Sequence, residues 1–111
     1  LPLVNPEDSF TDIILIITKK SLGCAAVVDN NQKLLGIITD GDLRRNIDKD
    51  LTILKAIDIM TTLPKSVNQN ILASEALFIM NNKSITTLPV TEDNKIIGII
   101  HIHDLIRAGI T

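Results

Sequence analysis

The stretch Gly36–Ile47, GIITDGDLRRNI, returns in altered form at Gly98–Ile110 as GIIHIHDLIRAGI. Gly98 lies 62 residues after Gly36, and the aspartates Asp42 and Asp104 are separated by the same interval (98 − 36 and 104 − 42). We expect this offset to hold through the preceding hairpin too, which places Val90 on Val28. Such self-similarity predicts a duplicated unit, and neither half is long enough to bury a core well by itself.

Each copy predicts the order β-α-β-β-α. The fold class is therefore α/β (α+β), with two such repeats packed against each other as a pseudo-twofold pair. We expect repeat 1 in residues 1–50, a helical connector in 51–62 and repeat 2 in 63–111. The expected strands are at 1–4, 24–29, 34–39, 63–67, 86–91 and 95–101, and the expected helices follow 5, 40, 70 and 103.

Helical spacing of apolar residues marks the buried faces. The first helix is expected to enter at the Asn5-Pro6 pair, because asparagine caps helices and proline suits the first turn. Gly23 and Gly109 are expected to end helices in the left-handed conformation. The predicted inward residues are Phe10, Ile13, Ile14 and Ile17 in repeat 1, Leu54, Ile57 and Met60 in the connector, and Leu72, Ala76, Leu77 and Met80 in repeat 2.

Composition argues against several classes of protein. The net charge is −2, and Phe10 and Phe78 are the two aromatic residues. Binding of nucleic acid favours a basic stripe and stacking rings, so we expect no nucleic-acid partner. The apolar runs are too short to span a bilayer, so we expect no membrane partner. Cys24 is the single cysteine, and the chain opens at Leu1 in mid-pattern; we expect a fragment of a longer cytoplasmic protein.

Thr39 and Asp42 stand where a strand is expected to pass into a helix. A carboxylate there can accept hydrogen bonds from the neighbouring hydroxyls of a ribose, and the threonine hydroxyl can face the same cleft. The same two residue types also cap helices. The sequence leaves both interpretations open, since a duplicated fold duplicates its caps as well.

The doubled motif resembles a pair of CBS domains (cystathionine-β-synthase type), whose repeats end in a glycine-bearing strand followed by T-x-x-D. Within that family, "GCAAVVDNNQKLLGIITDGDLRRNID" and "HDLIRAGI" resemble the C-terminal half of D-arabinose 5-phosphate isomerases. In those enzymes a sugar isomerase (SIS) domain precedes the CBS pair. The resemblance implies a regulatory module of the Kdo and lipopolysaccharide pathway, a catalytic SIS domain upstream, and no catalytic residue in these 111 residues.

The resemblance also implies a ligand site in the cleft between the repeats. The candidate ligands are AMP, ADP, ATP and the cytidine sugar nucleotide CMP-Kdo, and no cofactor is required. His101 replaces the threonine of the second motif, which departs from a standard adenosine site. The implied ligand-binding residues are Cys24, Ala25, Thr39, Asp42 and Arg45 in repeat 1, and Thr86, Thr87, His101, His103 and Asp104 in repeat 2.

Other candidate groups have two interpretations each. Arg44, Arg45 and Arg107 are able to clamp a phosphate or to be solvated surface residues; Arg45 is favoured because it shares a helix face with Asp42. The pair His101 and His103 is a weak metal pattern, since zinc sites normally need three or four protein ligands. Cys24 is expected to be a buried strand residue rather than a nucleophile.

Three functions compete at this stage. The first is a nucleotide-sensing regulatory module whose ligand biases an attached isomerase domain. The second is an oligomerisation module that holds isomerase domains together, because CBS pairs often form homodimers. The third, an enzyme complete in itself, is disfavoured because the sequence offers neither a nucleophile with its base nor a metal cluster.

Overall fold

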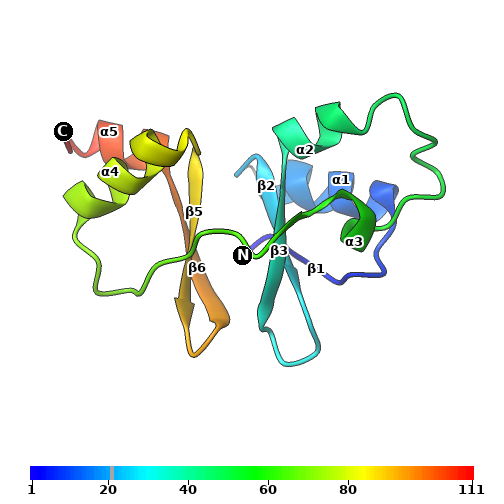
Figure 1. The fold of residues 1–111 in the computed structure, drawn as a ribbon, viewed down its shortest axis with the longest axis horizontal. Coiled ribbons are helices and arrows are strands. Elements are labelled where there is room, and N and C mark those ends of the chain that lie inside the picture. Colours follow the sequence, from blue (N-terminus) through cyan, green and yellow to red (C-terminus); the bar gives the residue numbers. More distant parts are fainter. Residues whose placement is uncertain (21) are drawn as a thin grey trace. The chain divides into compact units, whose positions relative to one another are not determined.

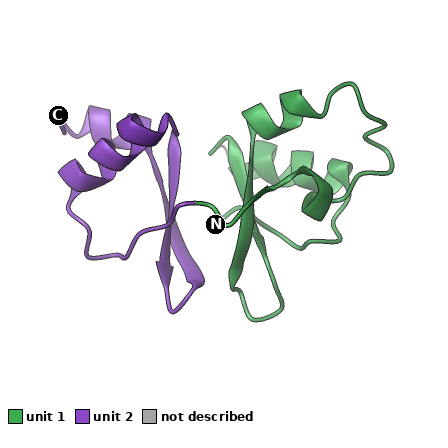
Figure 2. Ribbon diagram, viewed as in Figure 1, with its two compact units in different colours: residues 1–64 green, residues 65–111 purple. Residues whose placement is uncertain are grey.

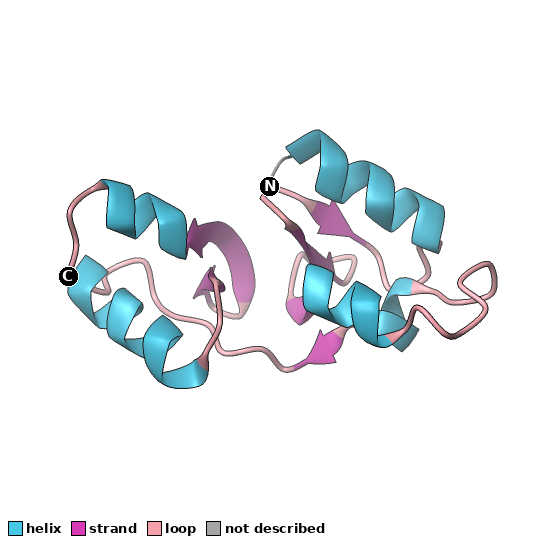
Figure 3. Ribbon diagram, turned by 90° about the horizontal axis from the view of Figure 1, so that it is seen from above, coloured by secondary structure: helices cyan, strands magenta, loops and turns pink. Residues whose placement is uncertain are grey.

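Among the residues that the structure describes, buried apolar side chains form a hydrophobic core in each of the units Leu1–Pro64 and Lys65–Thr111. Figure 2 shows the two units in different colours. The structure is a computed structural model that describes residues 1–20 and 22–111. Each unit has helices gathered to one side of its strands (Figure 3). The predicted α/β class with two β-α-β-β-α repeats is confirmed.

The first unit contains a four-stranded sheet in the order β1-β2-β3-β4 (Figure 1). Strand β1 is parallel to β2, and the other neighbouring pairs are antiparallel. Helices α1, α2 and α3 accompany the sheet. The elements are β1 (Leu3–Val4), α1 (Phe10–Lys20), β2 (Cys24–Val28), β3 (Leu34–Thr39), α2 (Asp40–Arg45), α3 (Ala56–Ile59) and β4 (Thr61–Thr62).

The second unit repeats this order with fewer strands. Strands β5 and β6 form an antiparallel pair, and Val67 adds a single parallel bridge to Val90 in place of a full first strand. Residues 108–111, which follow α5, form neither helix nor strand. The elements are α4 (Ala73–Lys83), β5 (Thr87–Glu92), β6 (Lys95–His101) and α5 (Ile102–Arg107).

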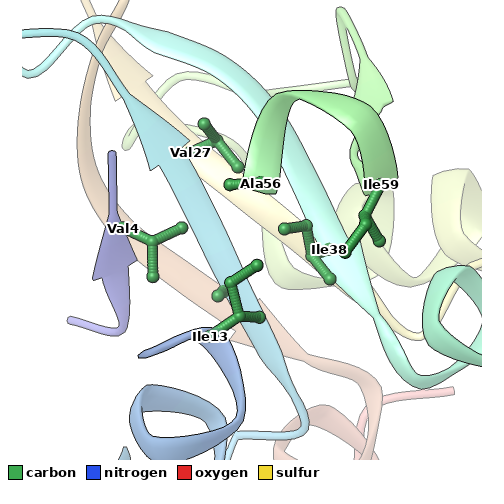
Figure 4. Close-up of a cluster of buried hydrophobic side chains, with 7 residues drawn as sticks. Val4, Ile13, Val27, Ile38, Ala56 and Ile59 are labelled. Atoms are coloured by element: carbon green, nitrogen blue, oxygen red, sulfur yellow. The ribbon is translucent and has the colours of Figure 1, made fainter. Parts of the chain in front are cut away.

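The core of the first unit joins its helices to the inner strands. Ile13 of α1 is fully buried, as predicted, and lies with Val27 and Ile38. Ala56 and Ile59 of α3 point into the same cluster (Figure 4). The segment after α2 is therefore part of the first unit's core, because its apolar side chains are buried there.

Three local expectations are wrong, each for a physical reason. The first helix begins at Phe10 rather than Pro6, because Ser9 caps it: the Asp12 N–H donates to Ser9 Oγ at 3.2 Å. Asn5 and Asp8 form a preceding turn instead, closed by a 2.9 Å bond from the Asn5 N–H to Asp8 Oδ2. In the connector, Ile59 is buried whereas Ile57 is half exposed, since only four residues are helical. Leu72 precedes α4 and is exposed.

The offset between the repeats is not constant. Val27 pairs with Gly36 in the first hairpin, and Val90 pairs with Gly98 in the second. Val90 therefore corresponds to Val27 rather than Val28, because the second hairpin is one residue shorter. The predicted left-handed glycines are confirmed, with φ of +69° at Gly23 and +81° at Gly109.

Candidate functional site

The motif Thr39–Asp42 forms a tight corner between β3 and α2. Thr39 ends the strand in an extended conformation and caps the helix. Its backbone N–H donates to Asp42 Oδ2 at 2.9 Å, and its hydroxyl donates to the same oxygen at 3.1 Å. Asp42 therefore closes the corner on itself, as the capping interpretation predicts.

The second oxygen of Asp42 is occupied as well. Thr61 of β4 donates its hydroxyl to Asp42 Oδ1 at 2.7 Å, and the Arg45 guanidinium pairs with that oxygen too. A carboxylate offers about four acceptor positions, so these donors and those from Thr39 fill them. Asp42 is only 4% exposed, and this network is the physical reason that a charged side chain can be buried here.

The four donors differ in how easily they could leave. The Arg45 side chain is 67% exposed, so its guanidinium can turn into solvent. Thr61 and Thr39 are held by strand pairing in β4 and β3. A ligand hydroxyl that reached Asp42 would therefore replace Arg45 first.

Cys24 and Ala25 lie on β2 beside this corner. Cys24 pairs with Thr39 and Ala25 with Ile38. Both side chains are fully buried, and Ala25 belongs to the hydrophobic core. Burial, together with the negative charge of Asp40, raises the pKa of the Cys24 thiol to about 11. The thiol is therefore protonated at neutral pH, which disfavours nucleophilic chemistry.

The corresponding corner of the second unit is more open. His101 caps α5, and its Nδ1 accepts a 3.1 Å hydrogen bond from the His103 backbone N–H. The centroids of the His101 and His103 rings are 4.6 Å apart, and the ring planes are tilted by 53°. Asp104 accepts a 2.8 Å bond from Arg107, and its side chain remains 58% exposed.

The predicted pocket threonines of the second unit have different environments. Thr87 is buried and pairs with His101, which makes it the counterpart of Cys24. Thr86 is exposed, and its carbonyl accepts a 2.9 Å bond from the Ile102 N–H. The structure thus brings Thr87 beside His101, while Thr86 holds the start of α5.

Sequence reasoning missed two members of the first corner. Thr61 reaches Asp42 across 19 residues, and the side chain of Asn46 donates to the Asp42 carbonyl at 2.7 Å. No spacing rule pairs Thr61 with Asp42, because the contact depends on β4 joining the sheet. Asn46, four residues after Asp42, lies at ordinary helical spacing and could have been proposed.

Two further features bear on function. Within residues 1–20 and 22–111, no three His, Cys, Asp or Glu side chains are arranged to hold a metal ion. None of the helices described there is long and apolar enough to cross a membrane.

Known sequences show where this chain belongs. The CBS domain family model matches twice, at residues 1–49 and 50–110. The chain is 43% identical to arabinose 5-phosphate isomerase KdsD of Yersinia pestis and 40% identical to KdsD of Escherichia coli (strain K12), over 99% of this chain and 34% of each relative. It is 51% identical to protein RP505 of Rickettsia prowazekii (strain Madrid E), over 100% of this chain and 35% of that protein. The chain therefore spans about a third of the length of these relatives.

Solved structures agree with this assignment. The CBS domain protein NE2398 superposes with a TM-score of 0.88 at 27% identity, over 98% of this chain and 87% of that one. The complex of CBSX2 with AMP superposes with a TM-score of 0.82 at 27% identity, over 96% and 85% of the two chains. This chain belongs to the CBS domain family, as a tandem pair of CBS domains.

Proposed function

We propose that this CBS pair is a nucleotide-sensing regulatory module of an arabinose 5-phosphate isomerase. The observation that carries the proposal is the corner at Asp42, a carboxylate whose most exposed donor, Arg45, can be exchanged for a ligand hydroxyl. Similarity to KdsD over nearly the whole chain and to a CBS protein crystallised with AMP supports it.

Binding is proposed to proceed by exchange of donors. The ribose hydroxyls of a nucleotide donate to Asp42 in place of Arg45, and the released guanidinium pairs with the ligand phosphate, for which its planar fork is suited. Thr61 also contacts Asp42, so the same exchange acts on β4 and the chain that leads into the second unit. A ligand regulates only if it binds two arrangements of the protein unequally.

The proposal also includes the predicted residues of the second unit, taken by themselves. Thr87 and His101 pair at one strand end, and Asp104 supplies a second, more exposed carboxylate. His101 in place of a threonine is proposed to change which ligand the second unit prefers. The set comprises Cys24, Ala25, Thr39, Asp42 and Arg45, with Thr86, Thr87, His101, His103 and Asp104.

Adenine nucleotides and CMP-Kdo are both proposed ligands, because they share a ribose and a phosphate. Calorimetric titration with AMP, ADP, ATP and CMP-Kdo separates them by the base and the attached sugar. A ligand that binds only the folded chain adds about 2.7 kcal/mol of stability at one hundred times its Kd. For a chain of this size that corresponds to a rise in Tm of about 10 °C. No response to any of the four compounds would contradict the proposal.

Arg45→Met tests the exchange of donors, with Arg44→Met as the matched control on the same helix. If Arg45 holds the phosphate, its loss weakens AMP about tenfold, by about 1.4 kcal/mol. Adenosine has no phosphate and should bind Arg45→Met at least as well as the native chain. Equal effects of the two variants on AMP would exclude this role for Arg45.

The catalytic part of the protein is proposed to lie outside these residues, in an upstream SIS domain of a cytoplasmic parent. The chain itself is proposed not to convert D-arabinose 5-phosphate to D-ribulose 5-phosphate. An isomerase assay on the 111-residue chain should give no turnover above buffer. Turnover retained by the purified chain would overturn this part of the proposal.

A scaffold is the second candidate function. Phe78 on α4 is 68% exposed and Ile106 on α5 is 57% exposed, so the second unit presents apolar side chains that a homodimer could cover. Light scattering of the native chain and Phe78→Ser tests this, since the variant should be monomeric at concentrations where the native chain is a dimer. Dimerisation without any nucleotide response would favour the scaffold over the sensor.

A further inference from the structure

The start of α5 is capped by an imidazole, whereas the corresponding start of α2 is capped by the threonine Thr39. His101 Nδ1 accepts a 3.1 Å hydrogen bond from the His103 backbone N–H. A ring nitrogen that accepts a hydrogen bond carries no proton, so His101 is neutral and its proton is on Nε2. The cap therefore exists in one charge state and one tautomer of this side chain.

Protonation of His101 would remove this cap. The imidazolium has an N–H at both ring nitrogens and no acceptor, so the new Nδ1–H would point at the His103 N–H. A positive charge is also unfavourable beside the free N–H groups of the first turn of a helix. Imidazole is the side chain whose ordinary change of charge falls between pH 5 and 8. Mild acid therefore acts directly on the group that holds the first turn of α5.

The charged groups beside His101 come mainly from α5. The His103 ring lies 4.6 Å from the His101 ring, and Arg107 donates to the His103 carbonyl at 3.4 Å; both disfavour a further positive charge. Asp104 favours such a charge, but it already pairs with Arg107 at 2.8 Å. Strand β5 places the neutral Thr87 opposite His101. The charged residues of α4, neither of which forms a salt bridge among the described residues, are Glu75 and Lys83.

Loss of the cap should have a local effect, because α5 has other attachments. The six residues of α5, all of which the structure describes, are exposed or half-buried. Ile102 donates its N–H to the Thr86 carbonyl at 2.9 Å, and Ile102 and Leu105 pack against the second core. These contacts do not titrate near neutral pH. Acid should therefore release the first turn, which carries Asp104, while the rest of the helix stays in place.

We propose that His101 is a pH-sensitive cap, bound to the His103 N–H at neutral pH and released when mild acid protonates the ring. Thr39, at the corresponding position of the first unit, has a hydroxyl that keeps its charge state over this range. The histidine of the second motif thus gives the second unit a response to pH that the threonine of the first motif does not provide. This inference does not depend on nucleotide binding.

Heteronuclear NMR of the 111-residue chain at about pH 7.5 and about pH 5 tests the proposal. At the higher pH, His101 should show a protonated Nε2 and a bare Nδ1. Exchange of the His103 amide with water, relative to the rate of an unstructured peptide at the same pH, should be about fivefold faster in acid. The Ala26 amide, which donates to the Pro2 carbonyl at 2.8 Å in the first unit, should keep its protection and so report that the chain stays folded.

Two variants separate the cap from the neighbouring ring. His101→Asn keeps an acceptor at the cap position, since asparagine is among the best capping residues, but it does not titrate. Its His103 amide should have the same relative exchange rate at both pH values. His103→Gln removes the neighbouring imidazole and keeps His101, so the amide of residue 103 should still respond to pH.

Several results would overturn the proposal. A bare Nε2 on His101 at neutral pH would show that Nδ1 carries the proton and cannot accept the bond. An equal response to acid in the native chain and His101→Asn would assign the effect to another group. Loss of the response in His103→Gln would assign it to the His103 ring. Loss of protection at Ala26 together with His103 would show general unfolding in acid rather than release of one cap.

Discussion

The two strand-to-helix corners share a motif but differ in what surrounds them. Asp42 is buried and accepts bonds from Thr39, Thr61 and Arg45, whereas Asp104 is largely exposed and accepts one bond from Arg107 among the described residues. The difference follows in part from β4, whose Thr61 hydroxyl reaches the carboxylate of the first corner. A repeated motif therefore fixes the local turn, and the segment packed over it decides how accessible the carboxylate is.

The largest expected difference between the two units is the effect of a substitution at Gly36 and at its counterpart Gly98. Gly36→Ala forces a Cβ to within 2.9 Å of the Thr61 carbonyl, so the variant should lose about 3 kcal/mol as β4 is pushed away. Gly98→Ala meets only ordinary contact with Val90 and removes a flexible residue from a strand, so stability should hold or rise by up to about 1 kcal/mol. Urea denaturation of both variants measures the two effects. Similar losses at the two positions would show that β6 is as tightly covered as β3.

The two aspartates give the next largest contrast. Asp42→Ala leaves the Thr39 N–H and the Thr61 hydroxyl without their buried acceptor, which should cost about 2 to 3 kcal/mol. Asp104→Ala removes an exposed ion pair and should cost less than about 0.5 kcal/mol. The measurement is again the free energy of unfolding.

The expected loss of stability in Asp42→Ala also affects how ligand binding can be tested. Asp42→Ala would weaken a nucleotide response through loss of the fold as well as loss of a contact. Nucleotide titrations of this variant therefore need a temperature at which circular dichroism shows it folded. A loss for Asp104→Ala equal to that for Asp42→Ala would remove the structural distinction between the corners.

Alkaline pH should affect the first unit through Cys24, which pairs with Thr39 on the neighbouring strand. The Cys24 thiol has a pKa of about 11 in the folded chain, against an ordinary value of 9.0, because it is buried and faces the negative charge of Asp40. The unfolded chain therefore binds fewer protons than the folded chain between these values, so stability falls as pH rises through this window. The loss should be about 1 kcal/mol by pH 10. Thr87, the counterpart of Cys24 in the second unit, does not titrate in this pH range.

The control for this prediction is Cys24→Ala. The difference in unfolding free energy between the native chain and Cys24→Ala should shrink steadily from pH 8.5 to pH 10.5, and urea denaturation at each pH measures it. A difference that stays constant over this range would mean that the thiol titrates alike in the folded and unfolded chains.

The features that the sequence predicted depend on interactions between residues close together in the chain. The features that it missed depend on contacts between residues far apart in the chain. The β-α-β-β-α order and the left-handed glycines follow from local spacing and local steric preferences, and these predictions are confirmed. The predicted start of α1 was wrong because the carbonyls of Pro6 and Asp8 accept bonds from the backbone N–H groups of Ile57 and Ala56, and no local pattern predicts these long-range contacts. The covering of Gly36 by Met60 and the bond from Thr61 to Asp42 could not be predicted, because both depend on which edge of the sheet the connector joins.

The smallest expected effect concerns that last bond. Thr61→Val keeps the shape and β-propensity of the side chain but removes the hydroxyl that donates to Asp42 at 2.7 Å. Arg45 still pairs with the same oxygen, so the carboxylate keeps a partner and the cost should be only about 1 kcal/mol. Thr62→Val is the matched control, since Thr62 lies next along β4 and makes no side-chain bond to Asp42; it should change stability by less than about 0.5 kcal/mol.

If the Thr61 bond holds β4 on the corner, the two valine variants should also differ in hydrogen exchange. The Leu63 N–H, which donates to the Leu35 carbonyl at 3.3 Å just beyond β4, should exchange faster in Thr61→Val than in Thr62→Val. Because Asp42 itself stays buried in both variants, such a change would report the attachment of the connector rather than general unfolding. Equal exchange in the two variants would mean that strand pairing alone holds β4, and that the buried carboxylate acts only within its own corner.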